Sequence, residues 1–280
     1  MNFRLGLIGY PVKHSLSPWI HSQLLNIAEL EGEYNVIEIK PDHLSRQLLD
    51  LKNKKINGFN VTVPYKEKII PYLDEIDDEA RAMGAVNTVL QKNNKWIGFN
   101  TDGKGYLRAL ENKFPGIMRD KMKSILIIGA GGASRGIYYA LNSAGFKRVD
   151  IANRTLEKAE SVLKLKNYQM KSSCLSIKGA EATLDKYEII IQTTSVGMKP
   201  REHEKIMKLD QLKPGTIVSD IVYQPIMTSF LQDAKERKAS IHMGHTMLIY
   251  QAQYAFEIWT KNLVPVDTLN KKLQAILEAE

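Results

Sequence analysis

The chain has 280 residues, with a hydrophobic fraction of 44%, a charged fraction of 25% and a formal net charge of +8. This length favours two globular domains, and no apolar run approaches the ~20 residues that a membrane span needs, which excludes a membrane protein. The single cysteine, Cys174, excludes an internal disulfide and a cysteine-based zinc site, and it makes the cytoplasm the default location.

The basic residues are scattered along the chain and interleaved with acids, whereas a nucleic-acid binder concentrates them on one face. The positive charge therefore favours a small anionic substrate or cofactor over a nucleic acid. The six histidines show no metal-ligand spacing, so no metal site is expected. Nothing in the sequence indicates the oligomeric state, and a homodimer stays open beside a monomer.

The first hundred residues alternate short strands with helices. Hydrophobic periodicity predicts strands over 3–9, 33–39, 57–63, 86–91 and 95–100, and helices over 17–30, 42–52, 66–76 and 103–113. The stretch Lys92-Asn-Asn-Lys95 is expected to form the turn between the last two strands. Pro115-Gly116 then breaks the chain.

A second unit begins with the apolar run after Ser124. This apolar run is predicted to be a strand, and further strands are predicted at 149–152, near 174–177, and at 189–191, 216–221 and 240–243. Helices are predicted after the first strand and over 156–165. Strands alternating with helices predict an α/β protein with a parallel, doubly wound sheet. The helical tail from Met247 is too short to be a domain, so we expect it to pack back on the first domain.

A glycine-rich turn lies between the first strand and the first helix of this unit, and it reads Gly129-Ala130-Gly131-Gly132-Ala133-Ser134. That context is the one in which glycines allow a tight turn and let the backbone approach a pyrophosphate at a helix N-terminus. The pattern favours dinucleotide binding over a glycine turn of some other α/β protein.

The end of the next strand indicates the type of dinucleotide. An NAD site usually offers an acid there for the ribose 2′-hydroxyl, whereas this chain has Asn153, Arg154 and Thr155, with Lys158 one helical turn later. A guanidinium suits a 2′-phosphate, so NADP is favoured over NAD. The alternative is that Asn153 and Thr155 cap the helix while Arg154 is solvated.

Polar residues at unusual places mark the first unit. Lys66 follows the strand in Asn-Val-Thr-Val-Pro-Tyr-Lys and falls in the first turn of the predicted helix 66–76, where the helix dipole disfavours a cation. Ser17 and Pro18 match the N-cap and first position of a helix, and Asp102 is also placed as an N-cap. Asn87 interrupts an apolar strand, so burial would require hydrogen-bond partners.

Nine motifs, taken in order, resemble those of the shikimate dehydrogenases over nearly the whole chain. They are S-L-S-P (15–18), N-V-T-V-P-Y-K (60–66), G-A-V-N-T (84–88), N-T-D-G-K-G (100–105), G-A-G-G-A-S (129–134), N-R-T (153–155), T-S-V-G-M (194–198), D-I-V-Y-Q-P (220–225) and M-L-I-Y-Q (247–251). The resemblance implies a substrate-binding domain, residues 1–101 plus 245–280, and a Rossmann-like NADP domain, residues 102–244. The two domains of that family flank a cleft.

The resemblance also implies the roles of individual residues in the NADP-dependent reduction of 3-dehydroshikimate to shikimate. Lys66 and Asp102 would be the acid–base pair. The substrate would be bound by Ser15, Ser17, Asn60, Thr62, Lys66, Asn87, Asp102, Tyr223 and Gln251. The cofactor would be lined by Asp78, Gly129, Ala130, Gly131, Gly132, Ala133, Asn153, Arg154, Thr155, Lys158, Thr194, Ile221 and Gly244.

Two departures from the family pattern are visible: Gly244-His245-Thr246-Met247 replaces a commoner run of small or apolar residues, and Lys158 replaces a second arginine. Two other functions stay open. One is a sister enzyme acting on quinate or another polyol acid. The other is a non-catalytic NADP-binding regulator, which would not need Lys66, Asp102 and Gln251 together.

Overall fold

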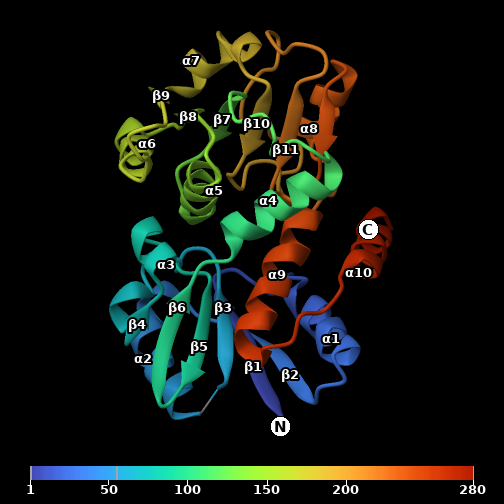
Figure 1. The fold of residues 1–280 in the computed structure, drawn as a ribbon. Helices are drawn as coiled ribbons and strands as arrows, with labels where there is room; N and C mark the ends of the chain where they lie inside the picture. The colour runs from blue at the N-terminus through green and yellow to red at the C-terminus, as the bar shows by residue number, and fades with distance from the viewer. Residues whose placement is uncertain (1, 55, 280) are drawn as a thin grey trace. The chain divides into compact units, whose positions relative to one another are not determined.

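The computed structural model describes residues 2–54 and 56–279. The chain divides into two compact units. Met1–Gly105 and Ile249–Leu269 form the first, and Tyr106–Leu248 and Asn270–Glu280 form the second. Each unit is built around its own six-stranded sheet (Figure 1), so the expected pair of α/β domains is confirmed.

The sheet of the first unit is mixed. Its strands are β2 (Gly32–Glu38), β1 (Phe3–Gly9), β3 (Gly58–Val61), β5 (Thr88–Lys92), β6 (Lys95–Phe99) and β4 (Glu75–Ile76), in that spatial order. Strand β1 is parallel to β2 and β3, whereas β5 is antiparallel to β3 and β6. The predicted turn between β5 and β6 is present, with φ values of 51° at Asn93 and 64° at Asn94. Asparagine tolerates this left-handed region better than most residues.

Strand β3 shows how this sheet is covered on both faces. Phe59 and Val61 join the apolar cluster that contains Leu48 and Leu51 of α2 (Leu44–Asn53). The alternate residue Gly58 lies against the indole of Trp259 in α9 (His245–Thr260). The tail therefore returns to the first unit over Ile249–Leu269, as predicted, whereas Asn270–Glu280 belongs to the second unit. The remaining helical elements of this unit are α1 (Ser17–Ile27), α3 (Asp78–Met83) and the short turns η1 (Pro41–His43) and η2 (Ile70–Tyr72).

The predicted helix over 66–76 is wrong. Residues 66–69 form turns, η2 and β4 follow, and the helix of this region is α3, which was not predicted. Two features explain the difference. The Lys66 carbonyl accepts from the Val86 N–H at 2.7 Å instead of from a residue four positions later, and Pro71 disfavours helical conformation at the residue before it. The expected helix dipole at Lys66 is therefore absent.

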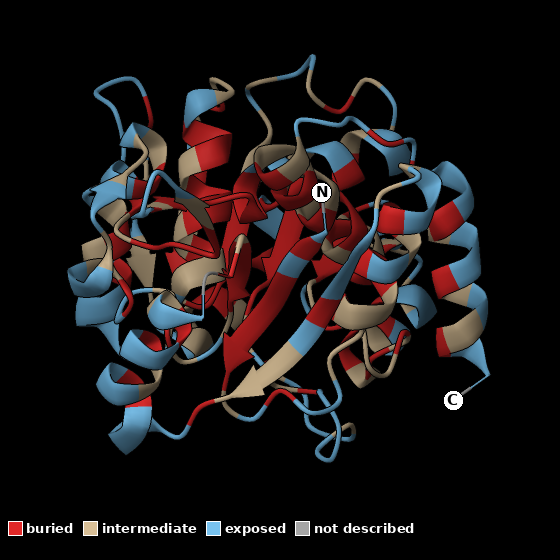
Figure 2. Cartoon of the chain, turned by 90° about the horizontal axis from the view of Figure 1, so that it is seen from below, coloured by how far each residue is buried: buried red, intermediate tan, exposed pale blue. Residues whose placement is uncertain are grey.

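The sheet of the second unit is all parallel. Its spatial order is β12 (Ser240–His242), β11 (Ile217–Asp220), β10 (Ile189–Gln192), β7 (Ser124–Ile128), β8 (Arg148–Ala152) and β9 (Cys174–Leu175). Read from β9, the strands follow the order 3-2-1-4-5-6, which is that of a dinucleotide-binding Rossmann sheet. The central strands of this sheet, β7, β10 and β11, are buried. Figure 2 shows a similar contrast in the first unit, where β1, which starts at the N label, is mostly buried and the edge strand β2 beside it is mostly exposed or partly exposed.

The helices of the second unit are α4 (Asp102–Lys113), α5 (Gly132–Ser143), α6 (Leu156–Leu163), α7 (Ile177–Glu181) and α8 (Ser229–Glu236), with the turn η3 (Leu184–Lys186). Helix α4 begins in the first unit, and α10 (Asp267–Glu278) ends the chain. The doubly wound prediction is confirmed, because helices follow the parallel strands along the chain.

Candidate active site

Lys66 and Asp102 form a short ion pair in the first unit. The Lys66 ammonium donates to Oδ2 of Asp102 at 2.6 Å, and the two side chains are 16% and 4% exposed. The Lys66 backbone is fixed from both sides, by the Val86 bond and by its neighbour Tyr65, whose buried hydroxyl donates to the Ile39 carbonyl at 2.5 Å. These bonds hold the turn in one conformation, so the Lys66 side chain leaves it in a fixed direction.

Asn87 joins this pair from the end of the segment before β5. It is 2% exposed, and its amide donates to Oδ1 of Asp102 at 2.9 Å. Gln251 of α9 lies beside the same amide, with Oε1 at 3.4 Å from Nδ2. The expectation that a buried Asn87 must have partners is confirmed. The alternative of Asp102 as an N-cap is wrong, since Asp102 is the first residue of α4 and its carboxylate contacts Lys66 and Asn87.

The two serines lie at the start of α1. Ser17 is the first residue of the helix and not its N-cap, which is Leu16. The Ser17 N–H donates to the Ser15 hydroxyl at 3.2 Å, and that hydroxyl lies 3.2 Å from the Ser17 hydroxyl. Two adjacent hydroxyls at a helix start can hold a carboxylate. Thr62 follows β3 and is half-buried.

Asn60 differs from the other predicted substrate residues because its amide is already engaged. Its oxygen accepts from the Tyr34 hydroxyl at 2.7 Å, and its nitrogen donates to the Asn87 carbonyl and the Thr88 hydroxyl, each at 3.1 Å. These bonds tie β2, β3 and β5 together beneath Asn87. Tyr34 was not singled out by the sequence, because a tyrosine on a strand carries no special signal.

The glycine loop connects β7 to α5 in the second unit. Gly129 has φ +114°, and a Cβ there would lie 2.5 Å from the Thr193 hydroxyl, so only glycine fits. Gly131 is exposed and forms the N-cap of α5, and a Cβ added there would meet nothing within 4 Å. Ser134 donates to the Gly129 carbonyl at 2.8 Å and closes the loop from within. Ala130, Gly132 and Ala133 complete the loop, each partly exposed. The loop thus leaves its backbone open for a phosphate at the start of a helix.

Arg154 follows β8 and is exposed, and within the part of the chain that the structure describes it makes no ion pair. The acid of β8, Asp150, is committed elsewhere: its carboxylate accepts from the Ser173 N–H at 2.7 Å and the Tyr187 hydroxyl at 2.9 Å. Thr155 occupies the N-cap of α6 without a side-chain bond, and Asn153 donates to the Thr155 carbonyl. Side-chain capping therefore does not occupy these residues, and Lys158 is exposed nearby.

A cluster of buried, hydrogen-bonded polar side chains lies at the ends of β10 and β11, and the sequence did not predict it. Asp220 is 1% exposed and accepts from the Val222 N–H, the Thr228 hydroxyl and the Gln192 amide, at 2.9, 2.8 and 3.2 Å. The Gln192 oxygen in turn accepts from the Thr194 N–H. Burial raises the pKa of Asp220 to about 7, although all three hydrogen bonds oppose the rise. A polar residue ending each of two apolar strands was the available signal.

This cluster fixes the two segments that bear three predicted site residues. Ile221 and Tyr223 lie one and three residues after Asp220, and Thr194 lies two residues after Gln192. Gly244 packs against the segment after Asp220 so closely that a Cβ would lie 2.5 Å from the Ile221 carbonyl. Tyr223 belongs to the second unit, whereas the other predicted substrate residues belong to the first. Asp78 begins α3 in the first unit and is exposed.

Comparison with known proteins identifies the family. The model "Shikimate dehydrogenase substrate binding domain" matches residues 7–89, "Shikimate / quinate 5-dehydrogenase" matches 110–223, and "Shikimate 5'-dehydrogenase C-terminal domain" matches 244–274. A shikimate dehydrogenase (NADP(+)) of Oceanobacillus iheyensis is 48% identical over 279 residues, covering 99% of both chains. The chain belongs to the shikimate dehydrogenase family. The resemblance seen in the sequence is thus confirmed.

Solved structures of this family share the fold. A shikimate dehydrogenase in complex with NADP+ superposes with a TM-score of 0.89 at 37% identity, covering 99% of this chain and 96% of that one. The shikimate dehydrogenase of Thermus thermophilus, in complex with NADP(H) and shikimate, gives a TM-score of 0.85 at 31% identity, covering 98% and 99%. The match spans the full lengths of these relatives.

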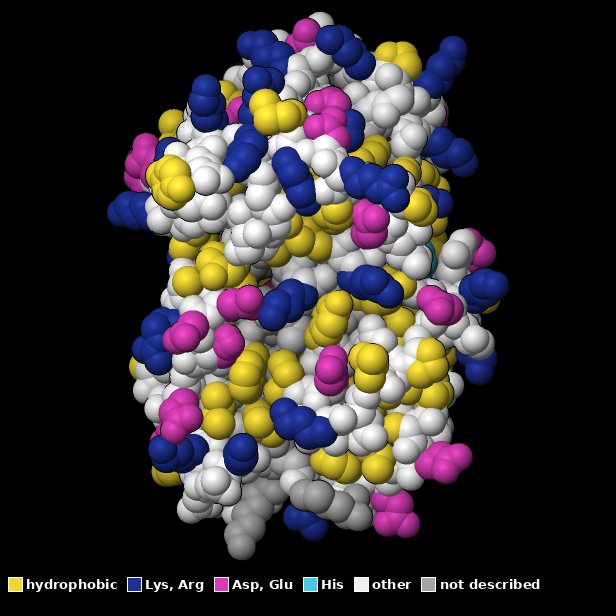
Figure 3. All heavy atoms as spheres, viewed as in Figure 1, with side chains coloured by type: hydrophobic (Ala, Val, Ile, Leu, Met, Phe, Trp, Pro, Cys, Tyr) yellow, Lys and Arg dark blue, Asp and Glu magenta, His cyan; other side chains and the backbone are white. Residues whose placement is uncertain are grey.

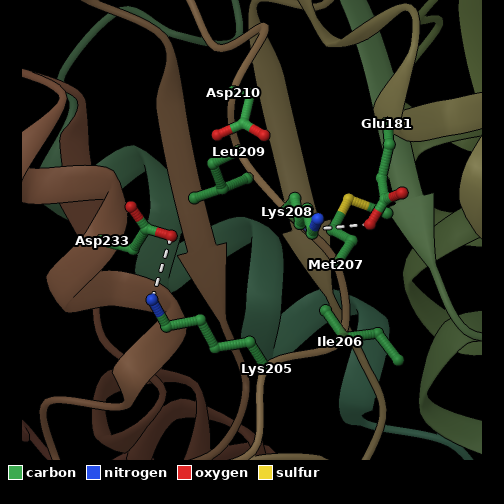
Figure 4. A pocket seen from close by; sticks show the side chains of 8 residues that line it. All are labelled: Glu181, Lys205, Ile206, Met207, Lys208, Leu209, Asp210 and Asp233. Carbon is green, nitrogen blue, oxygen red and sulfur yellow. Dashed lines mark hydrogen bonds and ion pairs between the residues drawn. The ribbon is translucent and has the colours of Figure 1, made fainter.

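Other features of this shikimate dehydrogenase family member lie away from the residues above. A pocket of about 260 Å³ in the second unit is lined by Glu181, Asp233 and residues 205–210, and Lys205 there donates to Asp233 at 3.1 Å (Figure 4).

Lysines and arginines are interspersed with acids on the face shown in Figure 3, without one basic patch. Among the described residues, no helix has the length and apolar character to cross a membrane, and no three potential metal ligands cluster.

Proposed function

We propose that this chain catalyses the reversible NADP-dependent reduction of 3-dehydroshikimate to shikimate, with Lys66 and Asp102 as the acid–base pair. The observation that carries the assignment is the 2.6 Å contact of Lys66 with Asp102, in a chain that is 48% identical to an NADP-dependent shikimate dehydrogenase over its whole length. Of the two solved relatives described above, one is in complex with NADP+ and the other is in complex with NADP(H) and shikimate.

The residues of the second unit fit NADP. The glycine loop presents open backbone at the start of α5, and Arg154 is exposed without an acidic partner among the described residues. We propose that residues 129–133 hold the pyrophosphate and that Asn153, Arg154, Thr155 and Lys158 hold the 2′-phosphate. Thr194, Ile221 and Gly244, together with Asp78, would line the rest of the cofactor. When bound, NADP supplies the hydride acceptor or donor of the reaction.

Lys66 would move the proton. In the oxidative direction, the O–H bond of the substrate C3 hydroxyl breaks, and the proton passes to the neutral amine of Lys66 as hydride leaves C3. In the reductive direction, the Lys66 ammonium returns a proton to the new alkoxide oxygen. Asp102 holds the lysine nitrogen in place through Oδ2, because Oδ1 is bound by Asn87. The chemistry therefore needs an ordered carboxylate beside Lys66.

Apart from Tyr223, the groups that would hold the substrate are hydroxyls and amides of the first unit. Ser15 and Ser17 would bind its carboxylate, and Thr62, Asn87, Gln251 and Tyr223 would contact the ring hydroxyls. The Asn60 amide already bonds to three neighbouring residues, and it would hold Asn87 in place through the hydrogen bond to the Asn87 backbone carbonyl. We assign substrate binding to residues 1–101 plus 245–280 and NADP binding to residues 102–244. A biosynthetic reaction in a chain with one cysteine favours the cytoplasm.

NADP⁺ reduction by the purified protein tests this function, with shikimate and quinate in parallel and NAD⁺ as the control cofactor. Turnover with shikimate and NADP⁺ alone is expected. Activity on quinate or with NAD⁺ at a similar rate would move the assignment to the sister enzyme named in the second family model. No turnover with any pair, in protein that binds NADP⁺, would instead favour a non-catalytic NADP-binding protein.

A further inference from the structure

The hydroxyl of Thr101 lies in the first unit between Asn87 and α9. Thr101 is 3% exposed and directly precedes Asp102. Its hydroxyl is 3.0 Å from the Gln251 backbone carbonyl oxygen, 2.9 Å from Nδ2 of Asn87 and 3.2 Å from Oδ1 of the same amide. A hydroxyl has one hydrogen to donate. The Gln251 carbonyl is the nearer of the two acceptors, and Oδ1 of Asn87 already accepts from two other donors, so Thr101 donates to Gln251 and accepts from Asn87.

The same residue fixes which way the Asn87 amide points. The backbone N–H of Thr101 lies 2.8 Å from Oδ1 of Asn87 and can only donate, so this atom must be the oxygen. The Thr88 hydroxyl is a second donor to this oxygen, at 2.9 Å. The amide nitrogen therefore faces the other way, toward the Thr101 hydroxyl and Oδ1 of Asp102, each at 2.9 Å. Its two hydrogens are matched by these two acceptors.

Asp102 is consequently held at both carboxylate oxygens. Asn87 donates to Oδ1 and Lys66 donates to Oδ2. We propose that Thr101 is a positioning residue for the reaction: it locks the Asn87 amide between its own hydroxyl and Asp102, and so orients the carboxylate that holds Lys66. This inference rests on the proposed acid–base role of Lys66 and Asp102.

The bond from Thr101 to α9 makes the arrangement rigid. It joins the start of α4 to the α9 backbone at Gln251, whose side chain reaches the same amide. Gly105, one turn after Thr101, approaches this place so closely that a Cβ would lie 2.6 Å from the Gln251 nitrogen. The two helices thus touch at backbone level, and the Thr101 hydroxyl is the polar link across that contact.

Three variants test the proposal. Thr101→Val keeps the shape and removes the hydroxyl, Thr101→Ser restores a hydroxyl, and Thr260→Val is the matched control. The Thr260 hydroxyl also donates to an α9 carbonyl, that of Phe256 at 2.8 Å, and it lies nine residues beyond Gln251. The measurements are kcat and KM for shikimate, NADP⁺ binding by fluorescence, and the melting temperature.

Thr101→Val should lower kcat by about tenfold, the effect of losing one buried hydrogen bond at its upper range, with NADP⁺ binding unchanged. KM for shikimate should change less than kcat, because Thr101 orients the pair Lys66 and Asp102 through Asn87. Thr101→Ser should restore most of the rate, and Thr260→Val should behave as the wild type.

The proposal is overturned if Thr101→Val keeps kcat within about twofold, if the loss lies in KM for shikimate instead of in kcat, or if Thr101→Ser is no better than Thr101→Val. Should Thr101→Val fail to fold, Thr101→Cys carries the same test, since a thiol is a weak donor. Lys66→Ala assayed in parallel separates the two claims. Full activity of that variant refutes the acid–base pair itself, and the role of Thr101 with it.

Discussion

Lys66 and Asp102 are 36 positions apart in the sequence, yet the lysine nitrogen lies 2.6 Å from Oδ2 of the aspartate. The lysine comes from a turn after β3, and the aspartate from the first residue of α4. Because the aspartate is nearly inaccessible to solvent, the pair is screened less than a surface salt bridge. Such a pair can hold a proton-transfer group in one orientation.

Replacement of this lysine should abolish most of the activity. Lys66→Ala is expected to lower kcat by ~10²–10⁴-fold, the usual effect of losing a general acid or base, while NADP⁺ still binds. Lys68→Ala is the matched control, because Lys68 is exposed two residues later in the same turn region. A loss of less than about tenfold in a folded Lys66→Ala protein would refute the assignment.

The sequence predicted the parallel sheet of the second unit well, because strand and helix patterns there are local and alternate regularly. It failed over 66–76, where apolar spacing suggested a helix. There the Lys66 carbonyl pairs with Val86, a partner 20 residues away. Periodicity cannot reveal a competing hydrogen bond from a distant segment. The isolated proline, Pro71, was the one local sign against a helix.

The candidate active site also contains some residues that the sequence predicts and others that only the structure identifies. The glycine loop and Arg154 were visible as local motifs, and Asn87 was flagged as a polar residue in an apolar strand. Thr101 and Tyr34 were not, because their importance lies in which atoms they reach: the Gln251 carbonyl and the Asn60 amide. Threonine and tyrosine are ordinary residues at strand ends and on strands. Only the folded arrangement distinguishes these two.

Arg154 should decide the choice between NADP and NAD. Arg154→Ala is expected to raise KM for NADP⁺ at least about tenfold, since a charge-assisted hydrogen bond contributes ~1.5–3 kcal/mol, while KM for NAD⁺ barely changes. Arg148→Ala serves as the control, because this exposed arginine lies at the opposite end of β8. Steady-state kinetics with both cofactors provides the measurement. Equal effects on the two cofactors would rule out contact with the 2′-phosphate.

The two glycines of the loop should respond differently to alanine. Gly131→Ala adds a methyl group that meets no protein atom, so the melting temperature should be unchanged while KM for NADP⁺ rises by about tenfold or more through loss of close phosphate approach. Gly129→Ala places a Cβ against Thr193 at φ +114°. It should cost at least the ~1–2 kcal/mol of left-handed backbone strain, because the added methyl group also overlaps the Thr193 hydroxyl.

Calorimetry and NADP⁺ titration of the two variants distinguish these effects. If Gly131→Ala bound NADP⁺ as tightly as the wild type, the pyrophosphate could not lie over this residue. If Gly129→Ala melted at the wild-type temperature, the strain assigned to its positive φ would be absent.

Acid should destabilise the first unit through His21. This ring is fully buried and stacks on the ring of Tyr34, with 4.3 Å between the ring centroids. Its centroid lies 5.2 Å from that of the Trp259 ring. Burial lowers the pKa of His21 from 6.5 to about 3. The folded state therefore keeps the ring neutral while the unfolded chain takes up a proton below pH 6.5, so stability falls as the pH decreases from 6.5 toward 3 and is unaffected by this group above 6.5.

Between pH 7 and pH 5, this one group should remove about 2 kcal/mol from the free energy of unfolding. His21→Phe keeps an aromatic ring against Tyr34 and should abolish that share of the loss, while His14→Gln, at an exposed position, should not. Urea titrations at the two pH values measure the difference. The same acid loss in wild type and His21→Phe would show that the buried ring is not the group responsible, because a neutral phenylalanine cannot take up a proton in either state.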